Sequence, residues 1–521
     1  MKIETLDLAV FLIYFLVVLG IALWVSRAPR GHTRNTEDYF LAGRGLPWWI
    51  IGASLVASNI STEQLVGMNG TAFVSGIAVI SYSWIGACIP QLLVAKFFLP
   101  AFLKMKVYSM PQFLELRFDH RVSTGMGIFW LLVYVFVNLT SVLYLGALSL
   151  ETLVGLPLVW GVVALAAVAA FYTVYGGLAP VAWTDFIQVA ILILGGAMVI
   201  VFGLDAVSGG NGIIAGFIEL LNRAPDKFHT VLEASHPDLP WTGVFFSGLW
   251  IAAVSYWGCN QYIIQKALAA RSLREAQYGL VFASFLSLTV SFIIVFPGVI
   301  AWVLYSDVIQ KPDEAYPTLI RELIPAGYTG LIIAALVAAI ISSLNSMTNS
   351  AATIFTMDVY RKLFRKDASE KECVQTGRIA SAVALTVASC CAPLLVNLSQ
   401  VFQFIQEYTG FITPGIMAIF LAGPFWKRAT SGAALAAALL TIPVSAALKF
   451  LLPNLGFLNR MGITFALLMA VIAVITFTTQ PDPERKERLE MREARFDTPA
   501  LFNALALLLL GTITALYLYF R

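Results

Sequence analysis

The residues best suited to chemistry are polar side chains that interrupt two long apolar stretches. The first cluster, residues 57–64, brings hydroxyl, amide and carboxylate groups together, and the second, residues 342–350, holds hydroxyls and amides after Ala338 and Ala339. Oxygen ligands without a concentration of carboxylates suit a monovalent hard cation better than Ca²⁺. The alternatives are hydroxyls that bond back to their own helix in the first cluster, and small residues that pack helices closely in the second.

Two further patterns place polar groups at the edge of an apolar stretch or beside aromatic rings. Asp185 needs a cation, a polar partner or water at that depth, and its position near one end of its stretch leaves solvation as an equal alternative. Aromatic residues lie beside amides in the segments 256–258 and 402–408. An aromatic face stacks on a sugar ring while amides bind its hydroxyls, although aromatics that only pack a core have the same composition.

The composition indicates that membrane-spanning helices position these groups. Of the 521 residues, 59% are apolar and 12% are charged, too few charges to cover a soluble protein of this size. The apolar stretches reach about 20 residues, the length that crosses a hydrocarbon core about 30 Å thick. We therefore expect an all-α polytopic membrane protein, with kinks in its second and eleventh spans. Fourteen spans are predicted, at 7–26, 47–70, 74–102, 122–150, 156–174, 183–207, 242–264, 276–304, 318–357, 376–394, 398–424, 430–450, 460–479 and 499–520.

The basic residues predict how the chain is oriented. Placing the connection 27–46 in the cytoplasm, with Arg27, Arg30 and Arg34, puts most of the 33 Lys and Arg residues in cytoplasmic segments, as the positive-inside rule requires. Both termini are then exterior. The charge-rich stretches 358–378 and 480–497 are predicted to be solvated cytoplasmic loops.

The sequence gives little support for nucleic-acid binding, proton-driven transport, enzymatic activity or a channel. The net charge of +3 is too small to indicate a nucleic-acid partner. Four of the five cysteines lie in apolar stretches, as small core residues do, and the four histidines fall in polar connections, which disfavours a proton relay within the membrane. We recognise no metal cluster, nucleophile–base pair or channel filter, so neither an enzyme nor a channel is expected. A cleavable signal peptide is not expected.

The predicted spans fall into two blocks of five, the second to the sixth and the seventh to the eleventh. Because five is odd, consecutive blocks have opposite topology, as in inverted-repeat transporters. The predicted organisation comprises an N-terminal extra helix and loop, a first repeat, an exterior loop, a second repeat and C-terminal extra helices, at 1–46, 47–207, 208–241, 242–424 and 425–521.

Several stretches along the chain, in order and at similar spacing, resemble the sodium:solute symporter family, and most closely its bacterial sodium/galactose (sodium/glucose) symporters of the Vibrio type. They are residues 36–43, 59–64, 138–145, 175–185, 260–265, 353–358 and 406–410. The resemblance implies a LeuT-type core of two inverted five-helix repeats with flanking helices. It implies a Na⁺ site at Ala57, Ile60, Ala339, Ser342 and Ser343. Relatives that bind a second Na⁺ use residues that match Asp185, Ser343 and Ser346.

The same resemblance implies an outer gate above a solute site. The gate is expected at Met68, Tyr82 and Phe402, and Trp257 lies beside the residue that stacks under the solute. That stacking residue corresponds to Tyr256.

The polar ligands of the solute are only partly retained. Gln64 and Gln406 match two amide ligands of the family. At four further ligand positions the chain departs from the family, because relatives carry glutamate, serine, asparagine and lysine where this chain has Ser83, Gly86, Ala253 and Ser287. Joint loss of the two charged groups avoids a buried unpaired charge. We therefore expect a larger, neutral pocket for a neutral sugar other than galactose or glucose.

These features together predict a Na⁺-coupled symporter that imports a small neutral solute, a sugar, by alternating access. The alternative solute is a non-sugar organic compound such as an amino acid, an organic acid or a polyol. The resemblance also implies Na⁺ as the coupling ion, a bacterial cytoplasmic (inner) membrane as the location, and a monomer that suffices for transport.

Overall fold

A computed structural model of the chain describes residues 5–25, 35–325, 327–397, 401–479 and 496–521. Within these ranges the protein is built from helices and holds two isolated β-bridges but no strand. The basic residues at positions 27, 30 and 34, on which the predicted orientation depends, lie outside the described residues. So does the stretch 480–495, which belongs to a predicted cytoplasmic loop. The α-helices are α1 (Thr5–Val25), α2 (Thr36–Leu41), α3 (Trp48–Asn59), α4 (Asn69–Ser75), α5 (Ser81–Ser83), α6 (Ile89–Leu93), α7 (Leu99–Lys104), α8 (Met110–Arg117), α9 (His120–Val133), α10 (Thr140–Val154), α11 (Leu158–Gly176), α12 (Leu178–Val207), α13 (Ile213–Arg223), α14 (Trp241–Phe246), α15 (Gly248–Cys259), α16 (Gln261–Leu268), α17 (Leu273–Tyr305), α18 (Ala315–Leu323), α19 (Thr329–Ile354), α20 (Glu370–Cys391), α21 (Val401–Thr409), α22 (Thr413–Phe425), α23 (Ser431–Leu451), α24 (Phe457–Thr478) and α25 (Ala500–Tyr519).

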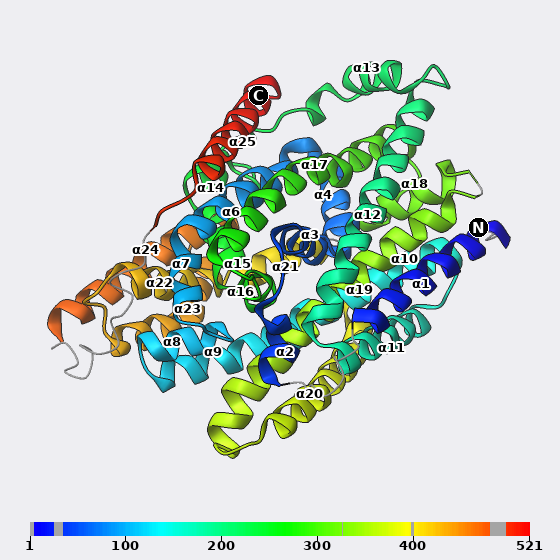
Figure 1. Cartoon of the computed structure of the whole chain (residues 1–521). Helices are drawn as coiled ribbons and strands as arrows, with labels where there is room; N and C mark the ends of the chain where they lie inside the picture. The colour runs from blue at the N-terminus through cyan, green and yellow to red at the C-terminus, as the bar shows by residue number, and fades with distance from the viewer. Residues whose placement is uncertain (1–4, 26–34, 326, 398–400, 480–495) are drawn as a thin grey trace.

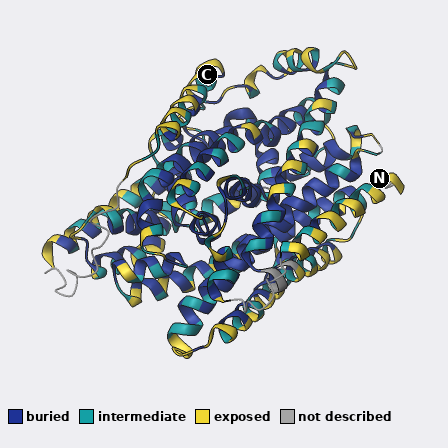
Figure 2. Ribbon diagram, in the orientation of Figure 1, coloured by how far each residue is buried: buried dark blue, intermediate teal, exposed yellow. Residues whose placement is uncertain are grey.

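Helices α3 and α19 form the centre of the bundle, and α1 and α25 lie on its periphery (Figure 1). Nearly every residue of α19 is buried, whereas α1 exposes large apolar side chains such as Leu16 and Trp24 (Figure 2). An apolar exposed face suits lipid, which solvates leucine and tryptophan without the cost that water imposes. The polar residues of the central helices are thereby kept from both water and lipid.

Among the described residues, ten helical stretches are long and apolar enough to cross a membrane, and the bent pair α21–α22 raises the number to eleven. The predicted spans 47–70 and 74–102 share one continuous stretch, Glu63–Lys104, that follows α3. The predicted span 156–174 has a shorter apolar part, and the predicted span 242–264 is divided among α14, α15 and α16. The all-helical polytopic fold is therefore confirmed, whereas the number fourteen is not.

The predicted single span 318–357 is wrong at its beginning. Helix α18 ends at Leu323 and α19 begins only at Thr329. Between them, Pro325 has no amide hydrogen to continue a helix, and Gly327 has a φ of +92°, which is outside the helical region. The polar cluster 342–350 consequently lies within one uninterrupted helix, α19.

Three central helices are broken or bent, and the second and eleventh predicted spans contain two of these irregularities. Helix α3 ends at Asn59, and α21 and α22 meet at an angle of 46°. Both predicted kinks are thus confirmed. A third break, at Asn260 between α15 and α16, was not predicted. Tyr134 fixes it from both sides, because its hydroxyl donates to the Asn260 side chain and accepts from the Gln261 amide at 2.9 Å.

Candidate functional site

The break in α3 leaves backbone carbonyls without their helical donors. In a continuous helix the carbonyl of Ala57 would accept from the amide of Ser61, but that amide donates to Asn59 at 3.0 Å. The carbonyl of Ile60 would accept from Gln64, whose amide instead donates to the Ser61 carbonyl at 3.1 Å. The Ser61 hydroxyl also accepts from the amide two residues on, which starts the next helical segment. Two of the predicted Na⁺ ligands are therefore buried oxygens with unused lone pairs.

Helix α19 packs against this break and presents two hydroxyls to it. Ser343 donates to the Ser58 carbonyl at 3.3 Å, and Ser342 donates to Asp185 Oδ1 at 2.5 Å. A hydroxyl that donates its hydrogen bond elsewhere keeps its lone pairs for a cation. The carbonyl of Ala339 belongs to the preceding turn of the same helix. The donor set thus consists of neutral oxygens and fits a monovalent hard cation.

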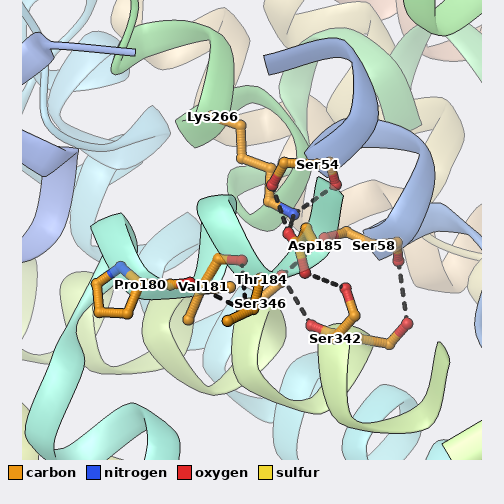
Figure 3. A network of polar contacts seen from close by, with 10 residues as sticks. Ser54, Ser58, Pro180, Val181, Thr184, Asp185, Lys266, Ser342 and Ser346 are labelled. Atoms are coloured by element: carbon orange, nitrogen blue, oxygen red, sulfur yellow. Dashed lines mark hydrogen bonds and ion pairs between the residues drawn. The ribbon is translucent and has the colours of Figure 1, made fainter. Parts of the chain in front are cut away.

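The predicted second cation site contains a charge that the sequence reasoning did not place there. Asp185 is fully buried on α12, which excludes the solvated alternative for this residue. The ammonium group of Lys266, on α16, lies 3.0 Å from Asp185 Oδ2 and is equally buried. Figure 3 shows the aspartate between Lys266, Ser54 and Ser342. Ser346 lies one turn along α19 and shares a 2.7 Å hydrogen bond with Ser58.

Lys266 follows an apolar run and was assigned to a cytoplasmic connection by the positive-inside rule. The signal that could have identified it is its position directly after the segment 260–265, on a short helix whose residues are all buried. Its partner lies 81 residues earlier, so local pattern alone does not pair them.

A cavity of about 160 Å³ adjoins the break in α3. A cavity of about 150 Å³ can hold a six-membered carbon ring. Gln64, Tyr256 and Gln406 all line it. The Tyr256 hydroxyl accepts from Tyr262 at 2.7 Å, and its ring meets that of Trp257 edge to face at 5.4 Å. These hydrogen bonds and ring contacts hold the tyrosine in place as a wall of the cavity.

Of the four positions where the chain departs from the family, two line the cavity and two do not. Ala253 and Gly86 line the cavity, but Ser83 and Ser287 are not among the lining residues. Ser287 is buried on α17 and accepts from Gln91 at 3.3 Å, and Ser83 is buried in α5. Two of the four departures therefore enlarge the cavity, while the other two contribute to packing beside it.

The pocket that was expected to be neutral contains one acidic side chain. Glu63, directly after the break in α3, lines the cavity and accepts a hydrogen bond from the Ser141 hydroxyl at 2.6 Å. Among the described lining residues it is the one with a carboxyl group, and none of them is Lys, Arg or His. The cavity therefore offers a strong hydrogen-bond acceptor without a balancing cation.

Two of the predicted gate residues contact each other at the wall of this cavity. The rings of Tyr82 and Phe402 meet edge to face at 5.4 Å, and both residues line the cavity. Met68 is fully buried and is not among the lining residues. Gly67 allows the close approach, because a Cβ at that position would lie 2.7 Å from the Cβ of Phe402. The gate contact thus joins the segment after the α3 break to the bent helix pair.

Comparison with known proteins gives consistent results. The sequence model described as the sodium:solute symporter family matches residues 39–441. The chain is 43% identical to a sodium/glucose cotransporter of Vibrio parahaemolyticus, over 99% of this chain and 98% of that protein. It is 36% identical to sodium/myo-inositol cotransporter 2 of Oryctolagus cuniculus, over 82% of this chain and 67% of that protein. The solved structure of a Na⁺-coupled sialic acid symporter in a substrate-bound outward-open state aligns with a TM-score of 0.79 at 25% identity, over 92% of this chain and 99% of that one.

Proposed function

The chain belongs to the sodium:solute symporter family, and from this premise we propose that it imports a small neutral sugar together with Na⁺, by alternating access. The observation that carries the proposal is the contact between two sites. Ser58 is one of the residues that line the solute cavity. Its backbone carbonyl accepts a hydrogen bond from the hydroxyl of Ser343, a predicted Na⁺ ligand, at 3.3 Å. Cation and solute would therefore bind to opposite sides of one break in one helix.

The coupling ion binds, in this proposal, to the carbonyls of Ala57, Ile60 and Ala339 and the hydroxyls of Ser342 and Ser343. The free carbonyls of the α3 break support this assignment, because a buried carbonyl without a donor is costly unless something binds it. A bound Na⁺ would tie the break to α19. Each Na⁺ that moves inward releases about 2.3 kcal/mol per 100 mV of membrane potential.

The solute binds against the ring of Tyr256, with its hydroxyls bonded to Gln64, Gln406 and Glu63. An amide both donates and accepts, so it matches a sugar hydroxyl, and a carboxyl oxygen adds a strong acceptor. A solute carboxylate would face Glu63 with no cation among the described lining residues. The cavity therefore favours a neutral polyhydroxylated ring over the organic acids that were left open by the sequence.

The outer gate closes over the solute through Tyr82 and Phe402, with Met68 packed behind them. Ring contacts of this kind are reversible and exclude water while they hold. Rocking of the helix bundle then exposes both sites to the cytoplasm, as inverted repeats permit. Trp257, whose indole donates to the Gly86 carbonyl at 3.0 Å, holds the wall beneath the solute in place.

A cyclic polyol is the second candidate solute. The relative from Oryctolagus cuniculus is named as a sodium/myo-inositol cotransporter, and the relative from Vibrio parahaemolyticus as a sodium/glucose cotransporter. Both solutes are neutral six-membered rings that carry hydroxyls. The same cavity chemistry suits either.

The remaining assignments belong to this proposal as well. The chain is a multi-pass membrane protein that we place in a bacterial cytoplasmic membrane with both termini exterior. The inverted repeats comprise residues 47–207 and 242–424, with extra helices in 1–46 and 425–521 and an exterior loop at 208–241. A monomer would suffice for transport.

Reconstitution into proteoliposomes tests the function. A panel of labelled hexoses, inositols, amino acids and organic acids would be offered with an inward Na⁺ gradient, with an equal K⁺ gradient and with the Na⁺ gradient collapsed by an ionophore. We expect saturable accumulation of a neutral ring solute under the Na⁺ gradient alone. Accumulation that is equal under K⁺, or that is confined to a charged solute, would contradict the proposal.

A further inference from the structure

The buried lysine of α16, Lys266, contacts two other helices. Its ammonium group lies 3.0 Å from Asp185 Oδ2 on α12 and donates to the Ser54 carbonyl of α3 at 2.7 Å. Both charged side chains are completely buried. Lysine is almost never fully buried unless it is paired, so the interaction with the aspartate accounts for its position.

Both oxygens of the Asp185 carboxylate already accept hydrogen bonds from the protein. Oδ2 accepts from Lys266 and from the Ser54 hydroxyl, and Oδ1 accepts from the Ser342 hydroxyl at 2.5 Å (Figure 3). The lysine and the aspartate together are electrically neutral. A Na⁺ ion at the same carboxylate would leave a net positive charge in a site that water does not reach, where like charges repel strongly.

The serines of the predicted second cation site are also engaged. The hydroxyl of Ser346 bonds to the Ser342 carbonyl at 2.9 Å and to the Ser58 hydroxyl at 2.7 Å. Ser343 donates to the Ser58 carbonyl and belongs to the first Na⁺ site. The donor set for a second Na⁺ is present in the sequence, but Asp185, its one charged member, is already paired with the Lys266 ammonium group in this structure.

We propose that Lys266 is the resident cation of Asp185, so that one Na⁺ is bound and transported per solute. This inference rests on the proposed function for its transport part only. Lys266 also acts as a positioning residue, because it holds the aspartate that accepts a hydrogen bond from the Ser342 hydroxyl and thereby leaves the lone pairs of that hydroxyl to the Na⁺. Two cations are thus linked through one carboxylate, and only one of them moves.

The proposal is tested by measuring how many Na⁺ ions bind per chain and how many are transported per solute. Equilibrium binding of ²²Na⁺ to the purified full-length chain, without solute, is expected to saturate at one ion per chain. In proteoliposomes, the reversal potential of coupled flux should give one Na⁺ per solute. A value of two in the wild type, by either measurement, overturns the proposal.

Variants of Lys266 test whether this lysine is the reason that only one Na⁺ binds. Lys266→Met frees Asp185 and should raise the number of bound Na⁺ from one to two, with a sigmoidal Na⁺ dependence of uptake. Lys266→Arg keeps the charge, and Lys266→Met with Asp185→Asn removes both charges, so each should bind one. A purely structural ion pair would lower the unfolding temperature of Lys266→Met without changing the number of bound ions, and that result would overturn the proposal.

Two features keep the experiment decisive. The wild-type count remains a test even where Lys266→Met does not fold. The binding measurement needs no transported solute, so a chain that binds one Na⁺ but accumulates nothing contradicts the proposed function and supports the inference.

Discussion

Replacing Ser343 by alanine is the most direct test of the Na⁺ site. The substitution removes one hydroxyl from a donor set of five oxygens in a position that is completely buried, so water has no access to replace it. The hydrogen bond that is lost with it, to the Ser58 carbonyl, is long at 3.3 Å and contributes little. An interaction between a hydroxyl and a charge stabilises by about 1.5–3 kcal/mol. At about 1.4 kcal/mol per tenfold, the Na⁺ concentration for half-maximal uptake should rise roughly 10- to 100-fold.

The assay is a Na⁺ titration of solute uptake in proteoliposomes at constant ionic strength. Thr348→Val is the matched control on the same helix, because Thr348 is also fully buried and its hydroxyl has no hydrogen-bond partner among the described residues. We expect the control to keep the wild-type Na⁺ dependence. An unchanged half-maximal concentration in Ser343→Ala, with normal protein levels, would refute the assignment of the site.

Three further substitutions probe the solute site, the gate and a buried carboxyl group directly before α18. Gln406→Ala should raise the solute concentration for half-maximal uptake about tenfold, since it removes amide hydrogen bonds of about 1 kcal/mol each, with little change in ²²Na⁺ binding. Gly67→Leu should abolish uptake but not Na⁺ binding, because its Cβ would lie 2.7 Å from that of Phe402 and displace the gate. Burial raises the pKa of Asp313, which accepts from the Val401 amide at 3.1 Å, from 3.8 to about 7. Because the pKa is raised in the folded state, the contribution of this group to stability is fully present below pH 3.8 and is lost as the pH rises to about 7. The unfolding temperature of the wild type should therefore fall between pH 5 and pH 8, and it should fall less in Asp313→Asn. A wild-type slope in that variant would exclude Asp313 as its source.

The break in α3 was predictable because many polar groups crowd into residues 57–64, and a lipid-embedded helix does not tolerate that density. The break at Asn260 was not, since the two amides of Asn260 and Gln261 in an apolar span are a much weaker signal. What fixes it is Tyr134, more than a hundred residues earlier in the chain. Local composition therefore indicates breaks that are rich in polar groups and misses those that depend on one distant partner.

The same limit applies to charge. The positive-inside rule treats each lysine as a loop residue, and that is correct on average because a buried ammonium group is costly. Lys266 is an exception that only its tertiary partner explains. Glu63 was recognised as part of a polar cluster, but whether it pointed to the cavity depended on how the chain continues after the break. Sequence located the polar segments, and the packing of α3, α12, α16 and α19 decided what each group faces.

Coupling between the two sites follows from how they share the broken helix. A Na⁺ ion between α3 and α19 would hold Ser58 against Ser343, and Ser58 is also part of the cavity wall. Ordering that wall lowers the entropy that a solute must lose on binding, so Na⁺ should increase the affinity for solute. Thermodynamic linkage then requires the solute to increase the affinity for Na⁺ by the same factor. The coupling in this account comes from the Na⁺ ion that joins α3 to α19, and the weak Ser343–Ser58 hydrogen bond only marks where the two helices meet.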